Sequence, residues 1–391
     1  MTLMPASHGP VSPLGASGSG QTPLASIQVL RALAALGVTA AHSVEQFAKR
    51  LGLPGVLPDL SLGMAGVDLF FVISGFIMVY ASEPLFAQPR APLIFALRRL
   101  ARIVPLYWAI SSVVLVYVLL HYHDLAAANI SPAWLASSFA FLPWPGVDGT
   151  MLPLVAVGWT LNYEMFFYAT FSLALLTSRR KAVVLLTLIY FAIVLAGRPL
   201  QPLPLMLTFW SDPIILEFVF GIVIASAFRE GWRLPAWASH GLLLAALAAF
   251  AVSGFWQRGI VPRPLEWGVP AAMAVAALVL GPVRHCTGFT SRLLGRLGDA
   301  SYALYLVHPL VLISPRWLFA RLIDPSYAPG VYAAGLVVAS AGVALIVHAL
   351  FEKPMTRRLQ RWLQRHVAQR EGLANNKPLG AGAGVTVEPH G

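Results

Sequence analysis

An arginine and a histidine lie eleven positions apart inside one apolar segment, and together they could bind an anion and accept a proton. Arg31 and His42 stand in the stretch LASIQVLRALAALGVTAAHSV, residues 24–44. At about 100° per residue, this spacing places both side chains on one face of a helix. Ionisable groups at membrane depth are costly, so such a pair indicates a functional site. The alternative is that Arg31 reaches the cytosolic headgroups while His42 caps the far end of the helix.

Two carboxylates within other apolar segments could assist this histidine. Glu164, in the stretch GWTLNYEMFFY, is expensive to bury unless it meets a cation or a hydrogen-bond donor, and Arg31 and His42 are candidates. Asp68, in GVDLFFVISGF, lies near the outer end of its segment. This is the same side of the membrane that His42 approaches. Either carboxylate could fix the tautomer of the histidine and make it a general base. The alternatives are a packing salt bridge for Glu164 and close helix packing by the glycines around Asp68.

A cluster of arginines opens the stretch RRLARIVPLYW, residues 98–108. Arg98 and Arg102 are four positions apart and share one face of a helix, and Arg99 lies beside them. Guanidinium groups bind phosphates through paired donors, so the cluster could hold a nucleotide-like donor substrate. The alternative is an anchor of the positive-inside type.

The composition indicates the class of protein that positions these groups. The chain has 391 residues, of which 58% are hydrophobic and 11% charged, and its mean hydropathy is +0.72. Long apolar runs recur throughout, so we predict an all-α, polytopic transmembrane bundle. The net charge of +11 lies in short loops and the tail, which argues against nucleic acid as a partner. The single cysteine, Cys286, excludes an internal disulfide, the histidine spacing shows no metal motif, and a lone loop cysteine is a poor candidate for an acyl carrier.

Hydropathy predicts about ten spans, and most basic residues fall in one alternate set of loops and in the tail. An even number of spans with this bias places both termini in the cytosol. The expected spans are 26–46, 60–82, 103–121, 154–176, 182–197, 211–228, 240–256, 267–283, 297–320 and 330–351.

The segments outside the spans are two terminal stretches, one amphipathic helix and one apolar loop segment. Residues 1–23 and 372–391 are Gly-rich or polar and are expected to be disordered on either side of a membrane domain at 24–354. Residues 355–371 alternate apolar and arginine positions as a basic amphipathic helix does, and we expect it on the inner membrane surface. An apolar piece at 134–144, in the longest outer loop, could cover a site.

Taken together, these motifs resemble the acyltransferase 3 family of integral membrane O-acyltransferases. The resemblance covers residues 24–356 and includes LGDASYALYLVHPL near the C-terminal end. The opening SIQVLRALAALGV is most similar to the branch that acetylates bacterial exopolysaccharides. The family implies a ten-helix enzyme that transfers an acyl group from cytosolic acyl-CoA to a hydroxyl of a sugar or related glycan.

The resemblance also assigns expected roles. Arg31 and His42 match the family's arginine–histidine signature, and Glu164 matches its carboxylate within a span. The arginine cluster would hold the phosphates of coenzyme A, and His42 would be the general base or, in a variant, carry the acyl group itself. Arg31 would neutralise Glu164 or polarise the thioester carbonyl. Candidate substrate-binding side chains in the same motifs are Trp159, Tyr168, Tyr302 and His308.

The expected partners follow from this assignment. Acyl-CoA, most simply acetyl-CoA, is a donor substrate, and no permanently bound cofactor or metal is expected. The other partners would be a glycan or lipid-linked glycan acceptor, the bilayer of the bacterial inner membrane, and polysaccharide-assembly proteins. The alternatives are another acceptor, such as a macrolide or periplasmic glucan, or a different class of protein, a transporter or flippase of lipid-linked glycans.

Overall fold

A computed structural model of the chain describes residues 23–51, 55–122, 130–146, 148–197, 204–253, 261–282, 288–313 and 328–375. Within these ranges the regular secondary structure is helical and no strand occurs, as hydropathy predicts. The predictions of disorder for residues 1–23 and 372–391 fall mostly outside the described ranges, as does the prediction for Cys286. Inside those ranges, Pro23 and residues 372–375 belong to helices, so the predicted disorder is wrong at these positions.

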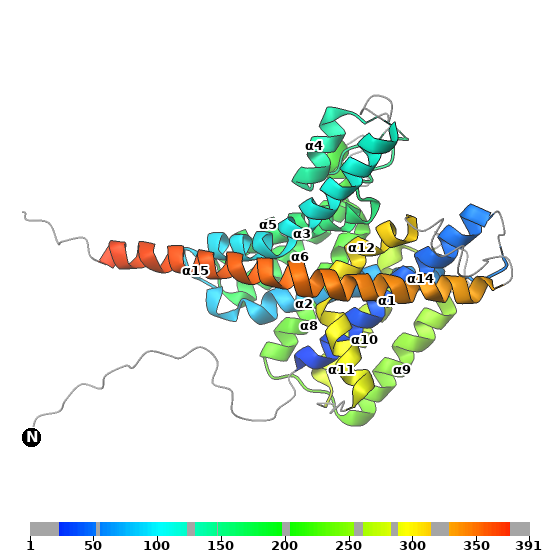
Figure 1. Cartoon of the computed structure of the whole chain (residues 1–391). Coiled ribbons are helices and arrows are strands. Elements are labelled where there is room, and N and C mark those ends of the chain that lie inside the picture. The colour runs from blue at the N-terminus through cyan, green and yellow to red at the C-terminus, as the bar shows by residue number, and fades with distance from the viewer. Residues whose placement is uncertain are drawn as a thin grey trace, which may run out of the picture.

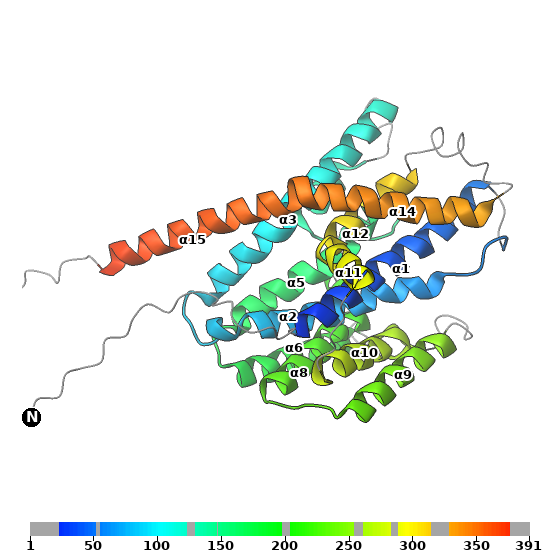
Figure 2. The ribbon, with the colours of Figure 1, turned by 60° about the horizontal axis from the view of Figure 1, so that its bottom comes forward.

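The helices form one bundle from which a single long rod extends (Figures 1 and 2). Short helical turns precede several of them, namely η1 Ser61–Ala65, η2 Glu83–Leu85, η3 Ala156–Gly158, η4 Pro213–Ile215, η5 Pro264–Gly268 and η6 His348–Glu352. In chain order the α-helices are α1 Pro23–Leu51, α2 Gly66–Ala81, α3 Ala91–Tyr122, α4 Pro132–Ala140, α5 Trp159–Ala174, α6 Arg179–Gly197, α7 Leu205–Trp210, α8 Leu216–Arg229, α9 Ala236–Ser253, α10 Val269–Leu280, α11 Phe289–Asp299, α12 Ser301–Ile313, α14 Pro329–Val347 and α15 Lys353–Asn375.

The helices bear out a multi-pass membrane protein, although not the count of ten spans. Each predicted span contains a helix, yet only six helices in the described residues are long and apolar enough to cross a membrane. The helices α5 and α8, with 16 and 14 residues, are only about 24 and 21 Å long. The hydrocarbon core is about 30 Å thick. The predicted spans 154–176 and 211–228 are long enough to cross a membrane only because each includes the short turn beside its helix.

Helix α1 occupies the middle of the bundle and packs against α2, α11, α12 and α14 (Figure 2). Its N-terminal part is tied to α11 by a hydrogen bond of 2.7 Å from Nε2 of Gln28 to Oδ1 of Asp299. Because protein surrounds α1 on several sides, Arg31 and His42 are both partly buried within the bundle. The expectation that they share a helix is confirmed.

Helices α2 and α8 meet at two glycines. A Cβ at Gly221 would lie 2.0 Å from the carbonyl oxygen of Val72, and a Cβ at Gly75 would lie 2.1 Å from that of Phe218. No other residue type fits at such a distance, so the two backbones approach as closely as small residues allow between membrane helices. This contact fixes the register of α2, which forms one wall of the site described below.

Replacing Gly221 by alanine is therefore expected to lower the free energy of unfolding by about 2 kcal/mol, because the methyl group would force the two helices apart. Thermal unfolding of the purified protein in detergent measures the change. The matched control is Gly241→Ala on α9, where a Cβ would meet nothing within 4 Å. Alanine there is expected to leave stability unchanged or to raise it by up to about 1 kcal/mol. Equal effects at the two positions would contradict the packing described for α2 and α8.

The C-terminal helix continues the direction of α14. Helix α14, the wider turn η6 and helix α15 form one rod, and α15 projects away from the bundle in both views (Figures 1 and 2). The amphipathic helix predicted over 355–371 is present and runs to Asn375. It shares the axis of α14 instead of turning aside along a membrane surface, because η6 joins the two helices without a break.

The apolar piece predicted at 134–144 contains the short helix α4, which packs beside α3. The hydroxyl of Tyr107 donates to the carbonyl of Ser138, and Nε1 of Trp108 donates to the carbonyl of Phe139, each at 2.9 Å. Trp134 in turn donates to the carbonyl of Leu152, also at 2.9 Å. These bonds from α3 and from within the loop position α4 against the C-terminal half of α3.

Candidate active site

A cavity of about 110 Å³ opens between α1, α2, α3, α5 and α12, which is enough for a small acyl group or several water molecules. The residues from α2 are apolar except for Ser74, and the charged groups come from α1, α3 and α5. Its lining residues are Arg31, Val67, Phe70, Phe71, Ile73, Ser74, Ile77, Met78, Arg99, Arg102, Ile103, Thr160, Leu161, Glu164, Tyr168, Ser301, Tyr302 and Tyr305.

The arginines that reach this cavity are not the pair that the i, i+4 spacing selected. Arg99 and Arg102 line it together with Arg31, whereas Arg98 is exposed and lies outside the lining. Positions 99 and 102 share the face of α3 that contacts the bundle, and position 98 is turned about 100° from 99. The guanidinium of Arg99 lies 5.3 Å from the ring centre of Phe95, and its buried Nε has no hydrogen-bond partner among the residues that the structure describes. An anionic ligand would supply that partner.

Glu164 faces the cavity from α5 and accepts two hydrogen bonds. The hydroxyl of Tyr168, one turn further along α5, donates to Oε1 of Glu164, and the hydroxyl of Ser74 on α2 donates to the same oxygen at 3.1 Å. The sequence predicted a cation or a donor for this carboxylate, and the structure provides these two donors. Arg31 lies near enough to interact electrostatically but donates its hydrogen bond, at 3.3 Å, to Oε1 of Gln28.

Two tyrosines of α12, Tyr302 and Tyr305, line the cavity. The hydroxyl of Tyr302 donates to the carbonyl of Ile103 at 2.8 Å, which ties α12 to the arginine-bearing part of α3. The hydroxyl of Tyr305 donates to the carbonyl of Val157 and accepts from Thr160, each at 3.0 Å. Of the predicted substrate-binding residues, Tyr168 and Tyr302 line the cavity, and Trp159 and His308 do not. Sequence reasoning passed over Tyr305, three positions after Tyr302.

His42 pairs with a second histidine just beyond the cavity. Its Nδ1 lies 2.9 Å from Nε2 of His308 on α12, and His308 is fully buried. The sequence predicted that Glu164 or Asp68 would orient His42, but both carboxylates have other partners. The ring of Tyr305, which lines the cavity, is centred 6.0 Å from that of His308. Tyr305 therefore lines the cavity and also lies next to the ring of His308.

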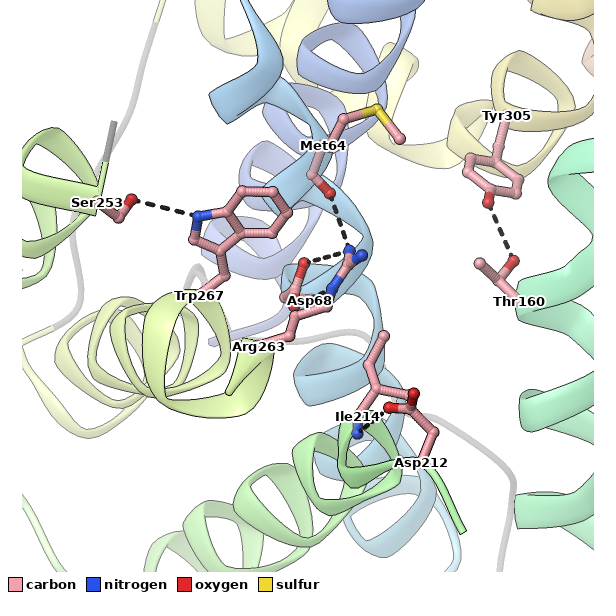
Figure 3. A network of polar contacts seen from close by, with 9 residues as sticks. All are labelled: Met64, Asp68, Thr160, Asp212, Ile214, Ser253, Arg263, Trp267 and Tyr305. Carbon is pink, nitrogen blue, oxygen red and sulfur yellow. Dashed lines mark hydrogen bonds and ion pairs between the residues drawn. The ribbon is translucent and has the colours of Figure 1, made fainter. Parts of the chain in front are cut away.

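Asp68 belongs to a third polar cluster, which Figure 3 shows between α2 and the turn that precedes α10. Nε and Nη2 of Arg263 donate to the two carboxylate oxygens of Asp68 at 3.0 and 2.8 Å. The same guanidinium lies over the rings of Trp267 and Trp159, at 4.9 and 5.9 Å from their centres. Trp159 is thus part of this cluster and not of the cavity. Arg263 lies in a predicted loop, and no sequence pattern around it indicates a contact with Asp68.

Glu217 on α8 lies beside this ion pair. It is fully buried, and the charged side chains with which it interacts are Asp68, Arg263 and Asp212. Gly268 packs directly against it, since a Cβ there would lie 2.8 Å from Cγ of Glu217. Arg263 is therefore the cation that compensates a group of acidic side chains.

Breaking this cluster is expected to destabilise the fold. Replacing Arg263 by methionine leaves Asp68 buried without its cation and is expected to lower the free energy of unfolding by about 3 kcal/mol. Asp68→Asn alone should cost a similar amount, and the double variant should cost less than the sum, with a coupling of about 1 kcal/mol or more. Unfolding of the four proteins in detergent measures this cycle. Additive losses would show that the two side chains do not act as a pair.

Comparison with known proteins decides what class of protein carries this arrangement. A family model described as an acyltransferase domain, acyltransferase 3, matches residues 24–349. The chain belongs to this family. It is therefore a multi-pass membrane acyltransferase, as the sequence motifs predicted, and the transporter interpretation is set aside.

Its relatives support the exopolysaccharide branch. The acyltransferase is 32% identical over 309 residues to the "Exopolysaccharide production protein ExoZ" of Rhizobium meliloti (strain 1021), covering 76% of this chain and 91% of that protein. It is 30% identical over 371 residues to "Acyltransferase MdmB" of Streptomyces mycarofaciens, covering 86% and 93%. The "Putative membrane-bound transacylase BcsY" of Komagataeibacter xylinus is 25% identical over 312 residues, covering 74% and 76%. No solved structure matches the chain.

The residues that line the cavity of the acyltransferase suit the binding of an anion. Among its described residues, no group of three or more His, Cys, Asp or Glu side chains could hold a metal ion. The cavity instead combines three arginines with one carboxylate that already has its own donors. Such a site can hold an anionic donor, and the nearby imidazole pair can accept a proton.

Proposed function

We propose that this acyltransferase transfers an acyl group, most simply acetyl, from cytosolic acyl-CoA to a hydroxyl of an exported polysaccharide. The observation that carries the proposal is the convergence of Arg31, Arg99 and Arg102 on one cavity, which Tyr305 also lines. Tyr305 neighbours His308, and His308 pairs with His42. The relative named for exopolysaccharide production supports a polysaccharide as the acceptor. The protein would work in the bacterial inner membrane with both termini in the cytosol, alongside polysaccharide-assembly proteins.

The arginines would hold the donor. Coenzyme A carries several phosphate charges, and guanidinium groups bind phosphates by charge-assisted hydrogen bonds. Arg99, whose buried Nε has no hydrogen-bond partner in the described part of the chain, is suited to this role. Ser74 and Tyr168 donate to Oε1 of Glu164, and the hydrogen bond of Arg31 goes to Gln28 and not to that carboxylate. Of its two expected roles, polarising the thioester carbonyl is thus the better supported.

His42 would act as the general base. A thioester is already activated, so the protein must position it, generate the nucleophile and stabilise the oxyanion. The hydroxyl oxygen attacks the thioester carbon and its proton passes to His42. The carbon–sulfur bond then breaks, and the departing thiolate takes up that proton as coenzyme A. In this scheme donor and acceptor meet at Tyr305, which lines the cavity and lies next to the ring of His308.

Labelled acyl-CoA tests the proposal directly. Sealed inverted vesicles containing the protein and polysaccharide acceptor should transfer label from [acetyl]-CoA, added on the former cytosolic side, into alkali-labile esters on the polysaccharide. Right-side-out vesicles with the donor outside should transfer none. Transfer that is equal in the two orientations would contradict a cytosolic donor site. Absence of transfer with every acyl-CoA tried would overturn the acyl-CoA donor.

A further inference from the structure

We propose that His308 is a positioning residue that holds His42 in the tautomer whose Nε2 is free to accept a proton. The inference rests on the proposed role of His42 and assigns His308 a role other than substrate contact. It follows from how the two rings meet and from what the second nitrogen of His308 contacts.

The two imidazoles form an in-plane hydrogen bond and are not stacked face to face. Their planes differ by only 13°, and their centres are 5.2 Å apart. The two nitrogens are 2.9 Å apart, which is shorter than the centre-to-centre distance by about two ring radii. Both nitrogens must therefore lie on the line that joins the ring centres. Since that line lies in the plane of each ring, the proton of one nitrogen points at the lone pair of the other.

The position of that proton follows from the far side of His308. Its Nδ1 lies 3.0 Å from the carbonyl oxygen of Leu304, and a carbonyl can only accept. Nδ1 of His308 therefore carries a proton. His308 is fully buried, and no carboxylate among the described residues pairs with it, so it is the neutral ring. Its Nε2 has the lone pair, and Nδ1 of His42 must be the donor.

This tautomer determines which nitrogen of His42 can accept a proton. A neutral His42 with its proton on Nδ1 has its lone pair on Nε2. When Nε2 takes a proton, the charge can be shared through Nδ1 with a neutral acceptor. The carboxylate near His42, Glu45 on the same helix, is exposed and paired with Lys49 at 2.6 Å. A carboxylate partner would bind that proton more strongly. His308 thus selects the tautomer while leaving His42 unprotonated before the reaction.

The neighbouring proline helps to explain why a histidine stands at position 308. Pro309 lacks an N–H, so the carbonyl of Tyr305 loses its helical donor. The backbone of Tyr305 also interacts with the His308 ring, alongside Leu304. Two backbone groups of α12 thereby hold the ring from behind. The orientation of His308, and through it that of His42, is built into this turn of the helix.

Two substitutions separate positioning from packing. Glutamine at 308 can still accept from Nδ1 of His42 through its amide oxygen, whereas leucine fills the space without an acceptor. We expect His308→Leu to lower kcat by about 100-fold with the KM for acyl-CoA within about twofold, because the wrong tautomer presents N–H to the acceptor. His308→Gln is expected to retain activity within about tenfold of the wild type. Folding is checked by thermal unfolding of both variants.

The tautomer itself can be observed in the unaltered protein. Nitrogen-15 NMR of histidine-labelled wild type in lipid vesicles, with the His42 signals assigned by their loss in His42→Ala, should show Nδ1 protonated and Nε2 not. In His308→Leu the Nε2-protonated form should gain population. A wild-type His42 protonated on Nε2, or a His308→Leu variant as active as wild type, would overturn the proposal. Because NMR needs no turnover, absence of acyl transfer by the wild type would count against the proposed function alone.

Discussion

Replacing His42 by alanine is expected to lower the rate of acyl transfer by about 1,000-fold, because in the proposed mechanism His42 is the general base for the acceptor hydroxyl. Binding of acyl-CoA should stay within about twofold of the wild-type affinity, since His42 does not line the cavity that would hold the donor. Transfer of label from [acetyl]-CoA measures the first effect, and calorimetric titration of the purified protein with CoA measures the second.

The control for this substitution is His240→Ala. His240 is exposed on α9, away from the cavity lining, so its replacement should leave both transfer and binding unchanged. Full activity of His42→Ala would remove the histidine from the mechanism and leave its pairing with His308 a structural one. Loss of donor binding together with transfer would place His42 in the donor site instead.

Arg99→Ala and Arg102→Ala are each expected to raise the KM for acyl-CoA by about 10- to 100-fold, because each removes charge-assisted hydrogen bonds worth about 1.5–3 kcal/mol. Arg98→Ala is the matched control, since it removes the same side chain from the same helix at a position outside the cavity lining. Its KM should change by less than about threefold. Initial rates at varied acyl-CoA concentration measure all three.

The result discriminates between two pairings of arginines. The i, i+4 spacing favours Arg98 with Arg102, and the structure favours Arg99 with Arg102. A larger effect at 98 than at 99 would support the pairing predicted from spacing and contradict the donor site described here. Raised salt should weaken donor binding in the wild type more than in Arg99→Ala, because one charged contact is already missing in the variant.

The sequence by itself determined the class of protein and most of its helices. Apolar runs of span length required a helical membrane bundle, and each predicted span contains a helix. The high cost of ionisable groups at membrane depth singled out Arg31 and Glu164, and both line the cavity. The ordered motifs also indicated the acyltransferase family, which the family model confirms.

Only the tertiary structure decided which of these groups meet. His42 pairs with His308, 266 positions away, and Asp68 pairs with Arg263, 195 positions away. Arg99 replaces Arg98 at the cavity because α3 turns that face toward α1 and α5. Helical periodicity shows which residues share a face of one helix, but not which face a neighbouring helix will cover. Which face is covered depends on packing across the bundle, as at Gly75 and Gly221, so only the tertiary structure shows it.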